Sequence, residues 1–383
     1  MLRIYGCLVL GLLTACGSTD ESRPGTGGSS AGGSAGVGGS GGIGGVAGGG
    51  GKPASCVSLD GKLQAALDAA RTQTGSRDAA LAVTTPECGS VTYISGESQL
   101  TGGELFRIGS VTKTYVATVV LQLVGAGKLS LDDKLETWVT GVPNGSAITV
   151  RMLLNHTSGI FNYTTDTTFL ANLKKKWTPD ELVQLAVSHG AVDPPGTKWE
   201  YSNTNYVCLG IIVEKVGGKG IAEQIRAGVL EPQKLDATFF DGEEALVGTL
   251  APGFSPTGTD STYAVDPSGP WAAGSMVATP ADTAAFVQAL AEGKLLDPAE
   301  QTAMETGVPL PGAPASYGLG LLMLDASVTA GAGKAYGHDG SINGYHTQAF
   351  HFRDTQTSIV SIVNQDGGDP NDVTLAALKA LFP

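Results

Sequence analysis

Short runs of alternating apolar and polar residues lie near both ends of the chain, with a more helical stretch between them. Residues 79–85 and 90–95 alternate in this way and flank the turn-like sequence Pro-Glu-Cys-Gly, which predicts an antiparallel hairpin. Residues 317–324, 347–353 and 357–364 have the same strand character. The pattern therefore predicts a sheet to which both ends of the chain contribute.

The stretch between these runs carries helix signals. Residues 178–181 and 279–282 each begin with Thr-Pro and reach an acid by the fourth position, the order of an N-cap, a first-turn proline and a first-turn acid. Residues 58–73 predict a helix before the hairpin, and a last helix opens at Asp369 and ends near Leu381. We therefore predict an α+β fold, an antiparallel sheet flanked by helices with an inserted, mainly helical subdomain.

Residues 111–124 fit either kind of element. Their many β-branched side chains favour a strand, whereas their length favours a helix, since strands usually have about 3–10 residues. Gly-Ala-Gly follows as a helix stop. We predict a buried helix with Ser110 at its amino-terminal edge.

Glycine is concentrated near the amino terminus. Residues 17–52 hold 17 of the 56 glycines and no aromatic residue, so they have too little apolar surface to offset the entropy of ordering them. We expect a flexible tether over residues 16–52. Residues 53–383 are then long enough for one large domain.

The first residues have the order of an export signal. Arg3 precedes the apolar run 4–13, and Leu-Thr-Ala-Cys at 13–16 resembles the lipobox of bacterial lipoproteins. We expect a signal peptide over residues 1–15 and a lipid on Cys16 that holds the exported protein at the cell envelope. Glycine after Cys16 favours the outer membrane, by analogy with lipoprotein sorting. The alternative is a plain secretory signal with an incidental cysteine.

Export also sets the oxidation state expected of the remaining cysteines. A helix over 58–73 and a returning strand over 79–85 have similar lengths, because they rise ~1.5 Å and ~3.3 Å per residue. Cys56 and Cys88 should therefore meet and form a disulfide. Cys208 lies in an apolar run and is expected to be a buried thiol.

Charge argues against several partners. The net charge is −13, with 23 basic and 36 acidic residues, which disfavours nucleic-acid binding.

The histidines do not indicate a metal site. His189, His346 and His351 have no cysteine or acidic partners at metal-ligand spacing. We expect no metal or other cofactor, and a monomer.

Ser110 and Lys113 form the only Ser-x-x-Lys of the chain. Positions i and i+3 share a helix face, so the amine can reach the hydroxyl and act as its base. The free N–H groups of the helix start can stabilise negative charge. Alone the motif is weak, because about one match is expected by chance in a chain of this length.

Two further motifs follow at wide spacing, Tyr201-Ser-Asn203 and His338-Asp-Gly340, each the only one of its kind. Together the three motifs resemble the signature elements of the penicillin-recognising serine hydrolases, which include D-alanyl-D-alanine carboxypeptidases, class C β-lactamases and related esterases. The resemblance runs from about Ser58 to the end of the chain. It implies a β-lactamase/DD-peptidase-like fold.

The resemblance also implies a role for each motif residue. Ser110 is the acylated nucleophile and Lys113 its proton acceptor. Tyr201 is a second acid/base that passes a proton to the leaving group, and the choice of Lys113 or Tyr201 as general base stays open. Asn203 holds Lys113 and the substrate amide, and His338 keeps the site electropositive.

The substrate end of the site departs from the carboxypeptidases that this chain resembles. The implied oxyanion hole is the backbone N–H groups of Ser110 and Ser341, and the implied substrate contacts are Asp339, Gly340 and Leu322. In the relatives an arginine and a threonine stand at the positions of Leu322 and Asp339 and help to hold a carboxylate. If Asp339 points into the cleft, a substrate carboxylate is repelled. The alternative is that Asp339 turns away and pairs with a cation.

Other polar and aromatic residues have structural interpretations. Residues 155–158, Asn-His-Thr-Ser, are interpreted as a turn that shapes the site, because such side chains cap neighbouring backbone. Trp177, Trp199 and Trp271 are interpreted as core or cleft wall.

The leading functional hypothesis is a lipid-anchored serine hydrolase that resembles D-alanyl-D-alanine carboxypeptidases and acts on cell-wall peptides. An esterase or a β-lactamase of the same fold is the alternative. A non-catalytic module that senses β-lactams or binds the wall is a third hypothesis.

Overall fold

The computed structural model describes residues 52–383. The predicted signal peptide, Cys16 and the tether up to residue 51 lie outside the described residues. Within residues 52–383, no helix has the length and apolar character needed to cross a membrane.

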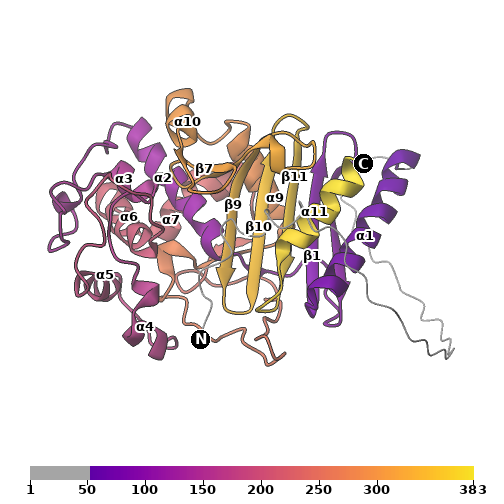
Figure 1. Ribbon diagram of the computed structural model, residues 1–383, viewed down its shortest axis with the longest axis horizontal. Helices are drawn as coiled ribbons and strands as arrows, with labels where there is room; N and C mark the ends of the chain where they lie inside the picture. The colour runs from indigo at the N-terminus through magenta and orange to yellow at the C-terminus, as the bar shows by residue number, and fades with distance from the viewer. Residues whose placement is uncertain (1–51) are drawn as a thin grey trace, which may run out of the picture.

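An eight-stranded antiparallel sheet forms the centre of the fold (Figure 1), in the order β2-β1-β11-β10-β9-β8-β7-β6. Its strands are β1 (Asp78–Thr85), β2 (Gly89–Gly96), β6 (Val308–Pro309), β7 (Ala315–Tyr317), β8 (Leu322–Leu324), β9 (Ala335–Ile342), β10 (Tyr345–Phe352) and β11 (Thr357–Val363). The first and last strands pair directly, with Ala79 opposite Val363. The prediction of a sheet built from both ends of the chain is confirmed.

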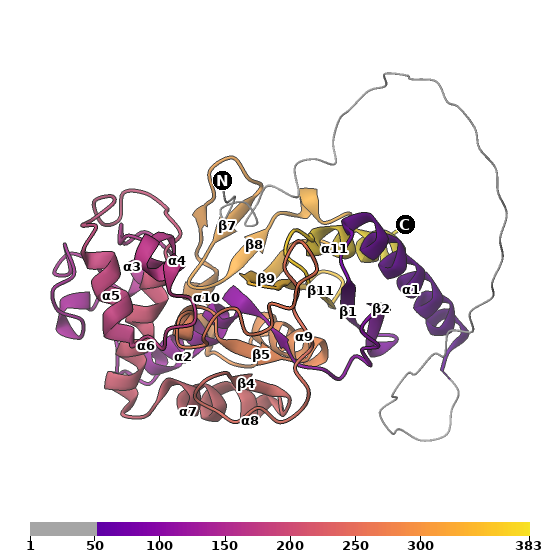
Figure 2. The same cartoon turned by 90° about the horizontal axis from the view of Figure 1, so that it is seen from below.

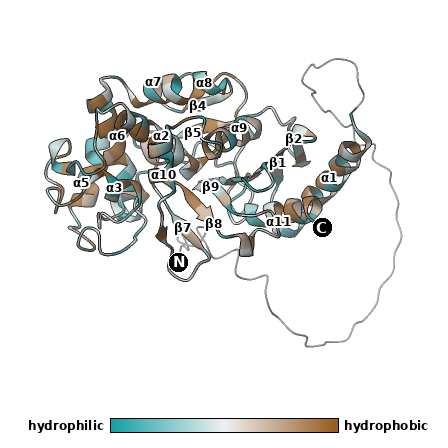
Figure 3. Cartoon of the chain, turned by 90° about the horizontal axis from the view of Figure 1, so that it is seen from above, coloured by the Kyte–Doolittle hydropathy of each residue, from teal (hydrophilic) through white to brown (hydrophobic). Residues whose placement is uncertain are grey.

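Helices cover both faces of this sheet. α1 (Ala54–Thr74) and α11 (Pro370–Leu381) lie side by side on one face (Figure 2), and both show apolar, brown turns (Figure 3). α9 (Pro280–Ala291) covers the other face together with the helical region. In β1, Leu81 packs in the cluster under α1 and α11, whereas Ala82 packs in the cluster under α9. The strand is therefore buried on both sides, as its apolar character requires.

The inserted region is mainly helical and lies beside the sheet (Figure 1). Its helices are α2 (Thr112–Gly125), α3 (Val150–Leu154), α4 (Thr167–Ala171), α5 (Pro179–Val187), α6 (Asn203–Gly217), α7 (Ile221–Ile225), α8 (Glu231–Gln233) and, near the sheet, α10 (Pro298–Glu305). A small second sheet has the order β3-β5-β4, from β3 (Phe106–Arg107), β5 (Met276–Ala278) and β4 (Thr238–Phe240). The predicted helix over 111–124 is confirmed as α2, in which nearly all side chains are buried. Tertiary packing therefore overrides the strand preference of its β-branched residues.

The helix starts predicted at Thr178 and Thr279 are confirmed. Thr178 and Glu181 form a capping box at α5, and the Thr279 hydroxyl accepts the N–H of Asp282 at α9. The first helix begins at Ala54, four residues before the predicted start at 58. That extension contains Cys56, which forms the predicted disulfide with Cys88 in the β1–β2 turn.

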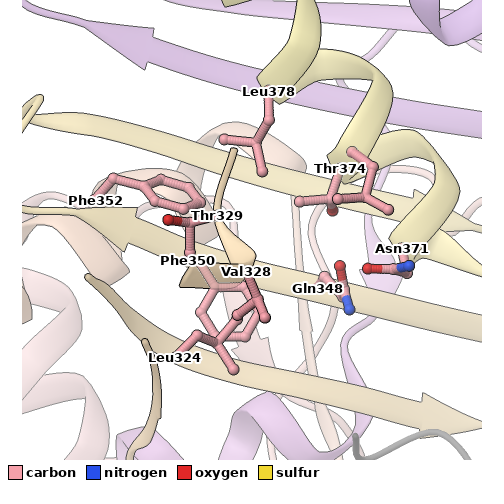
Figure 4. A pocket seen from close by; sticks show the side chains of 10 residues that line it. Leu324, Val328, Thr329, Gln348, Phe350, Phe352, Asn371, Thr374 and Leu378 are labelled. Carbon is pink, nitrogen blue, oxygen red and sulfur yellow. The ribbon is translucent and has the colours of Figure 1, made fainter. Parts of the chain in front are cut away.

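A small apolar cavity lies between α11 and the sheet (Figure 4). Leu324, Phe350 and Leu378 are among the side chains that line it. None of the predicted catalytic residues lines it. It is a packing defect in the interior rather than a candidate for the chemistry predicted at Ser110.

Candidate active site

Ser110 lies in a single 3-10 turn, Gly109–Val111, that runs directly into α2. The Thr112 hydroxyl donates to Gly109 O at 2.7 Å and accepts the Met276 N–H at 3.0 Å, which ties the turn to β5. The prediction that Ser110 stands at the amino-terminal edge of a buried helix is confirmed. The N–H groups of such a first turn have no acceptor within the helix.

Lys113 is buried, and its Nζ has three polar neighbours. Asn203 Oδ1 accepts at 2.8 Å, the Ala273 carbonyl accepts at 2.6 Å, and Ser110 Oγ lies at 2.9 Å. Burial holds the Lys113 pKa well below its usual range, and the charge of Asp339 offsets this only in part. In its neutral form the Lys113 amine can give its two N–H groups to the two carbonyls and direct its lone pair to the Ser110 hydroxyl.

Tyr201 lies on the other side of the nucleophile. Its phenol donates to Ser110 Oγ at 2.9 Å. Burial raises the pKa of Tyr201 well above its ordinary value, and the hydrogen bond to Ser110 offsets this only in part. The phenol is therefore held in its protonated, uncharged form.

Asn203 opens α6, and its amide is held from both ends. Its Oδ1 faces Lys113, while its Nδ2 faces Asn162 Oδ1 at 3.3 Å and Thr164 Oγ1 at 3.1 Å. The predicted contact with Lys113 is present. Asn162, Thr164 and the Ala273 carbonyl were missed at the sequence level, because a backbone carbonyl and lone polar loop residues carry no motif.

His338 is buried on β9 and carries no charge. Its Nε2 lies 2.8 Å from the Tyr317 hydroxyl. Burial, and then the charge of Lys113, lowers the pKa of His338 to about 3. The expectation that His338 keeps the site electropositive is therefore wrong, because burial disfavours the charged form of an imidazole.

Two glycines let the backbones of Ser110 and Ser341 meet. A Cβ on Gly109, whose φ is +52°, would lie 2.8 Å from Ser341 N. A Cβ on Gly340 would lie 2.0 Å from Ile108 O and 3.0 Å from Ser110 N. Only glycine permits this approach, so Gly340 shapes the backbone pair predicted as the oxyanion hole.

Asp339 lies opposite Gln348, a residue that lines the cavity under α11, so its side chain is on that face of the sheet. It is only 7% exposed. Burial raises the pKa of Asp339 to about 7. Within residues 52–383 no lysine or arginine pairs with it, and its Oδ1 has no hydrogen-bond partner. It therefore turns from solvent without the pairing cation that was expected for that orientation.

Leu322 is not a substrate contact. It is 2% exposed and packs with Tyr317 and Leu324 in the apolar cluster under α1 and α11. The prediction placed it beside the substrate by alignment of motifs alone. Strand β8 directs this side chain into the core, where it contributes packing and no polar group.

The turn over residues 155–158 is structural, as predicted. The Thr157 hydroxyl donates to Asn155 Oδ1 at 2.7 Å, and the Ser158 hydroxyl donates to Asn205 Oδ1 at 2.6 Å. Trp177 and Trp271 are buried in the core, and Trp199 is half-buried beside Tyr201. The described residues contain no group of three potential metal ligands.

Two solved structures resemble this chain over nearly their whole length. The D-stereospecific amidohydrolase from Streptomyces sp. is 34% identical, with a TM-score of 0.75, over 83% of this chain and 97% of its own. The D-amino acid amidase from Ochrobactrum anthropi SV3, complexed with L-phenylalanine amide, is 30% identical, with a TM-score of 0.76, over 84% and 99%.

The alignments with curated relatives cover a smaller share of each chain. Penicillin-binding protein 4* of Bacillus subtilis (strain 168) is 26% identical over 295 residues, which are 72% of this chain and 64% of that protein. The teichoic acid D-alanine hydrolase of Staphylococcus aureus is 26% identical over 203 residues, 52% of this chain and 49% of its own. The chain thus spans less than two thirds of the length of these relatives.

A family model covers almost all of the described residues. The profile described as Beta-lactamase matches residues 63–382, which include all three motifs of the site. The antiparallel sheet with its inserted helices is the fold that this family shares with the two amidases. The chain therefore belongs to the beta-lactamase family of penicillin-recognising serine hydrolases.

Proposed function

We propose that this protein forms an acyl-enzyme at Ser110 and hydrolyses amide bonds of D-amino-acid derivatives. The observation that carries the proposal is the position of the Ser110 hydroxyl, 2.9 Å from both Lys113 Nζ and Tyr201 OH. A serine is a weak nucleophile until a base takes its proton. Here a buried amine faces it on one side and a half-buried phenol on the other.

Acylation uses Lys113 as base and Tyr201 as acid. Lys113 Nζ accepts the Ser110 proton while Oγ bonds to the substrate carbonyl carbon, and the C=O electron pair moves to the oxygen. The N–H groups of Ser110 and Ser341 donate to that oxyanion. Tyr201 gives its proton to the leaving nitrogen as the C–N bond breaks, and the proton on Lys113 then restores the phenol.

Deacylation uses the same two groups in the same roles. Lys113 Nζ accepts a proton from water as the water oxygen bonds to the ester carbon, and Tyr201 gives its proton to Ser110 Oγ as the C–Oγ bond breaks. The proton on Lys113 then restores the phenol. The products are a carboxylic acid and the free enzyme. Burial supports this order, because it disfavours both a resting phenolate and a resting ammonium.

The substrate end of the site favours a leaving group without a carboxylate. Leu322 lies in the core and Asp339 lies on the α11 face of the sheet, so neither position supplies a cation to hold a substrate carboxylate. The names of the two similar solved proteins, an amidohydrolase and an amidase for D-amino acids, support an amide substrate. A cell-wall D-alanyl-D-alanine carboxypeptidase is the second candidate, which the likeness to penicillin-binding protein 4* favours.

A panel of four compounds tests the proposal. The protein and its Ser110→Ala variant are incubated with D-phenylalanine amide, a peptide ending in D-alanyl-D-alanine, p-nitrophenyl acetate and a fluorescent penicillin. We expect the highest kcat/KM for the amide and no turnover by the variant, which loses only a hydroxyl at a helix start. Faster release of D-alanine would favour the carboxypeptidase, and turnover by Ser110→Ala would contradict the acyl-enzyme.

A further inference from the structure

His156 holds the segment that carries Tyr201 from both sides. Its backbone carbonyl accepts the N–H of Glu200 at 2.9 Å, and its Nδ1 accepts the N–H of Ser202 at 3.2 Å. These are the two chain neighbours of Tyr201. His156 has a φ of +60°, an uncommon conformation that turns its carbonyl and its ring toward the same segment.

The His156 ring also packs on the phenol itself. The ring centroids of His156 and Tyr201 are 4.3 Å apart, and Tyr317 lies 4.9 Å from His156 on the same cluster. His156 is fully buried. The His156 carbonyl therefore restrains the Tyr201 backbone on one side, and the His156 ring restrains it on the other and packs against the phenol.

The hydrogen bonds define the protonation state of His156. Asn205 Nδ2 lies 3.1 Å from the same Nδ1, and the Ser158 hydroxyl occupies Asn205 Oδ1, so the amide presents its N–H to the imidazole. Nδ1 accepts and cannot carry a proton, which places the proton on Nε2. Burial holds the His156 pKa well below its usual range.

A direct acid or base role does not fit this geometry. Nδ1 is occupied by two donors, and Nε2 has no hydrogen-bond partner within residues 52–383. Lys113 Nζ and Tyr201 OH both lie 2.9 Å from Ser110 Oγ, in the positions that a direct acid or base needs.

We propose that His156 is a positioning residue that aims the Tyr201 phenol at Ser110 Oγ and thereby supports proton delivery to the leaving group. The inference rests on the proposed function, in which Tyr201 is the proton donor. It predicts that His156 matters most when the leaving group needs a proton. An amide nitrogen needs one, whereas p-nitrophenolate leaves without one.

The test compares two substrates with one acyl group, D-phenylalanine amide and the p-nitrophenyl ester of D-phenylalanine. His156→Leu keeps an apolar filling and removes the Nδ1 acceptor, and His156→Asn places an amide oxygen near Nδ1. We expect His156→Leu to lower kcat/KM by about 100-fold for the amide and less than about fivefold for the ester. His156→Asn should retain amide turnover within about tenfold of the parent.

A control variant separates positioning from loss of stability. His351 is also buried, and its Nδ1 faces Ser358 Oγ at 2.9 Å on the far strands β10 and β11. His351→Leu should lower the unfolding midpoint without changing the ratio of amide to ester turnover. An equal loss of both activities in His156→Leu would overturn the proposal.

A double variant asks whether His156 acts through Tyr201. In a Tyr201→Phe background, His156→Leu should lower amide turnover by less than about threefold further, because the group it positions is already gone. A full 100-fold loss in that background would overturn the inference.

If His156→Leu fails to fold, His156→Asn takes its place in the test. The proposal is contradicted if His156→Asn lowers kcat/KM for the ester by the same factor as for the amide. If the parent protein hydrolyses neither substrate, the proposed function fails and this inference falls with it, whereas an unchanged ratio in an active variant contradicts His156 alone.

Discussion

At the scale of single residues, burial sets the charge of every group around Ser110. Lys113 has a pKa well below its usual range, Tyr201 has one well above, and the pKa of His338 is lowered to about 3. Each shift favours the uncharged form, because desolvation penalises ions of either sign. The nucleophile thus stands among neutral donors and acceptors, which suits a site that moves protons in both directions.

Asp339 supplies a stability prediction with a defined sign. Its pKa is about 7 in the folded protein, against ~3.9 for an unfolded chain, so the folded state binds more protons between those values. The free energy of unfolding should therefore fall as pH rises from about 4 to 7. Asp339→Asn removes this effect, and its stability relative to the parent should grow by about 4 kcal/mol between pH 4 and pH 8.

Urea unfolding of both proteins at the two pH values measures this difference. The amide has the shape of the acid, so the packing around β9 is matched. If the difference in unfolding free energy between the parent and Asp339→Asn does not change with pH, the carboxyl is solvated or paired in solution.

At the scale of elements, the site depends on how closely strand β9 approaches the turn before α2. Gly109 and Gly340 face each other across this contact, and neither position has room for a side chain. The two helices that carry Lys113 and Asn203, α2 and α6, pack together on one side of the contact. The element packing therefore determines whether the Ser110 and Ser341 N–H groups can share one oxyanion.

Gly340→Ala tests this contact. The added Cβ would lie 2.0 Å from Ile108 O, so strand and turn must separate. We expect kcat/KM to fall by at least about 100-fold, the loss typical of an impaired oxyanion hole. Gly61→Ala in α1 is the matched control, because its Cβ would meet nothing within 4 Å. It should leave activity unchanged and raise stability by about 1 kcal/mol. If Gly340→Ala and Gly61→Ala have the same kcat/KM, catalysis does not depend on the close approach at Gly340.

At the scale of the whole molecule, the catalytic groups come from three distant parts of the chain. Ser110 and Lys113 follow β3, Tyr201 precedes α6, and Ser341 lies on β9. The pairing of β1 with β11 brings both ends of the domain into the same sheet as β9. Cys56 and Cys88 link the start of α1 to the β1–β2 turn, at the edge of the sheet where β2 is the last strand.

The proposed lipid anchor is tested on the intact chain. Cys16→Ser removes the residue that the lipobox-like sequence assigns to lipid, so the protein should move from the membrane fraction to the soluble fraction of the envelope. Its kcat/KM should not change, because the domain that carries Ser110 begins well after Cys16. Membrane retention of Cys16→Ser would show that another feature holds the protein there.

The sequence by itself determined the β1–β2 hairpin, β10, β11, the helix caps, the disulfide and the three motifs. These depend on residue type and local spacing, which the chain displays without folding. The sequence missed β9, and the run over 317–324, expected as one strand, forms β7 and β8 with a turn between them. Only the tertiary structure decided that His338 is neutral, that Leu322 lies in the core and that Asp339 is buried without a cation. It also decided that His156 accepts hydrogen bonds from both chain neighbours of Tyr201. Charge state and contact depend on burial and on distances between residues far apart in the chain, and these exist only once the chain is packed.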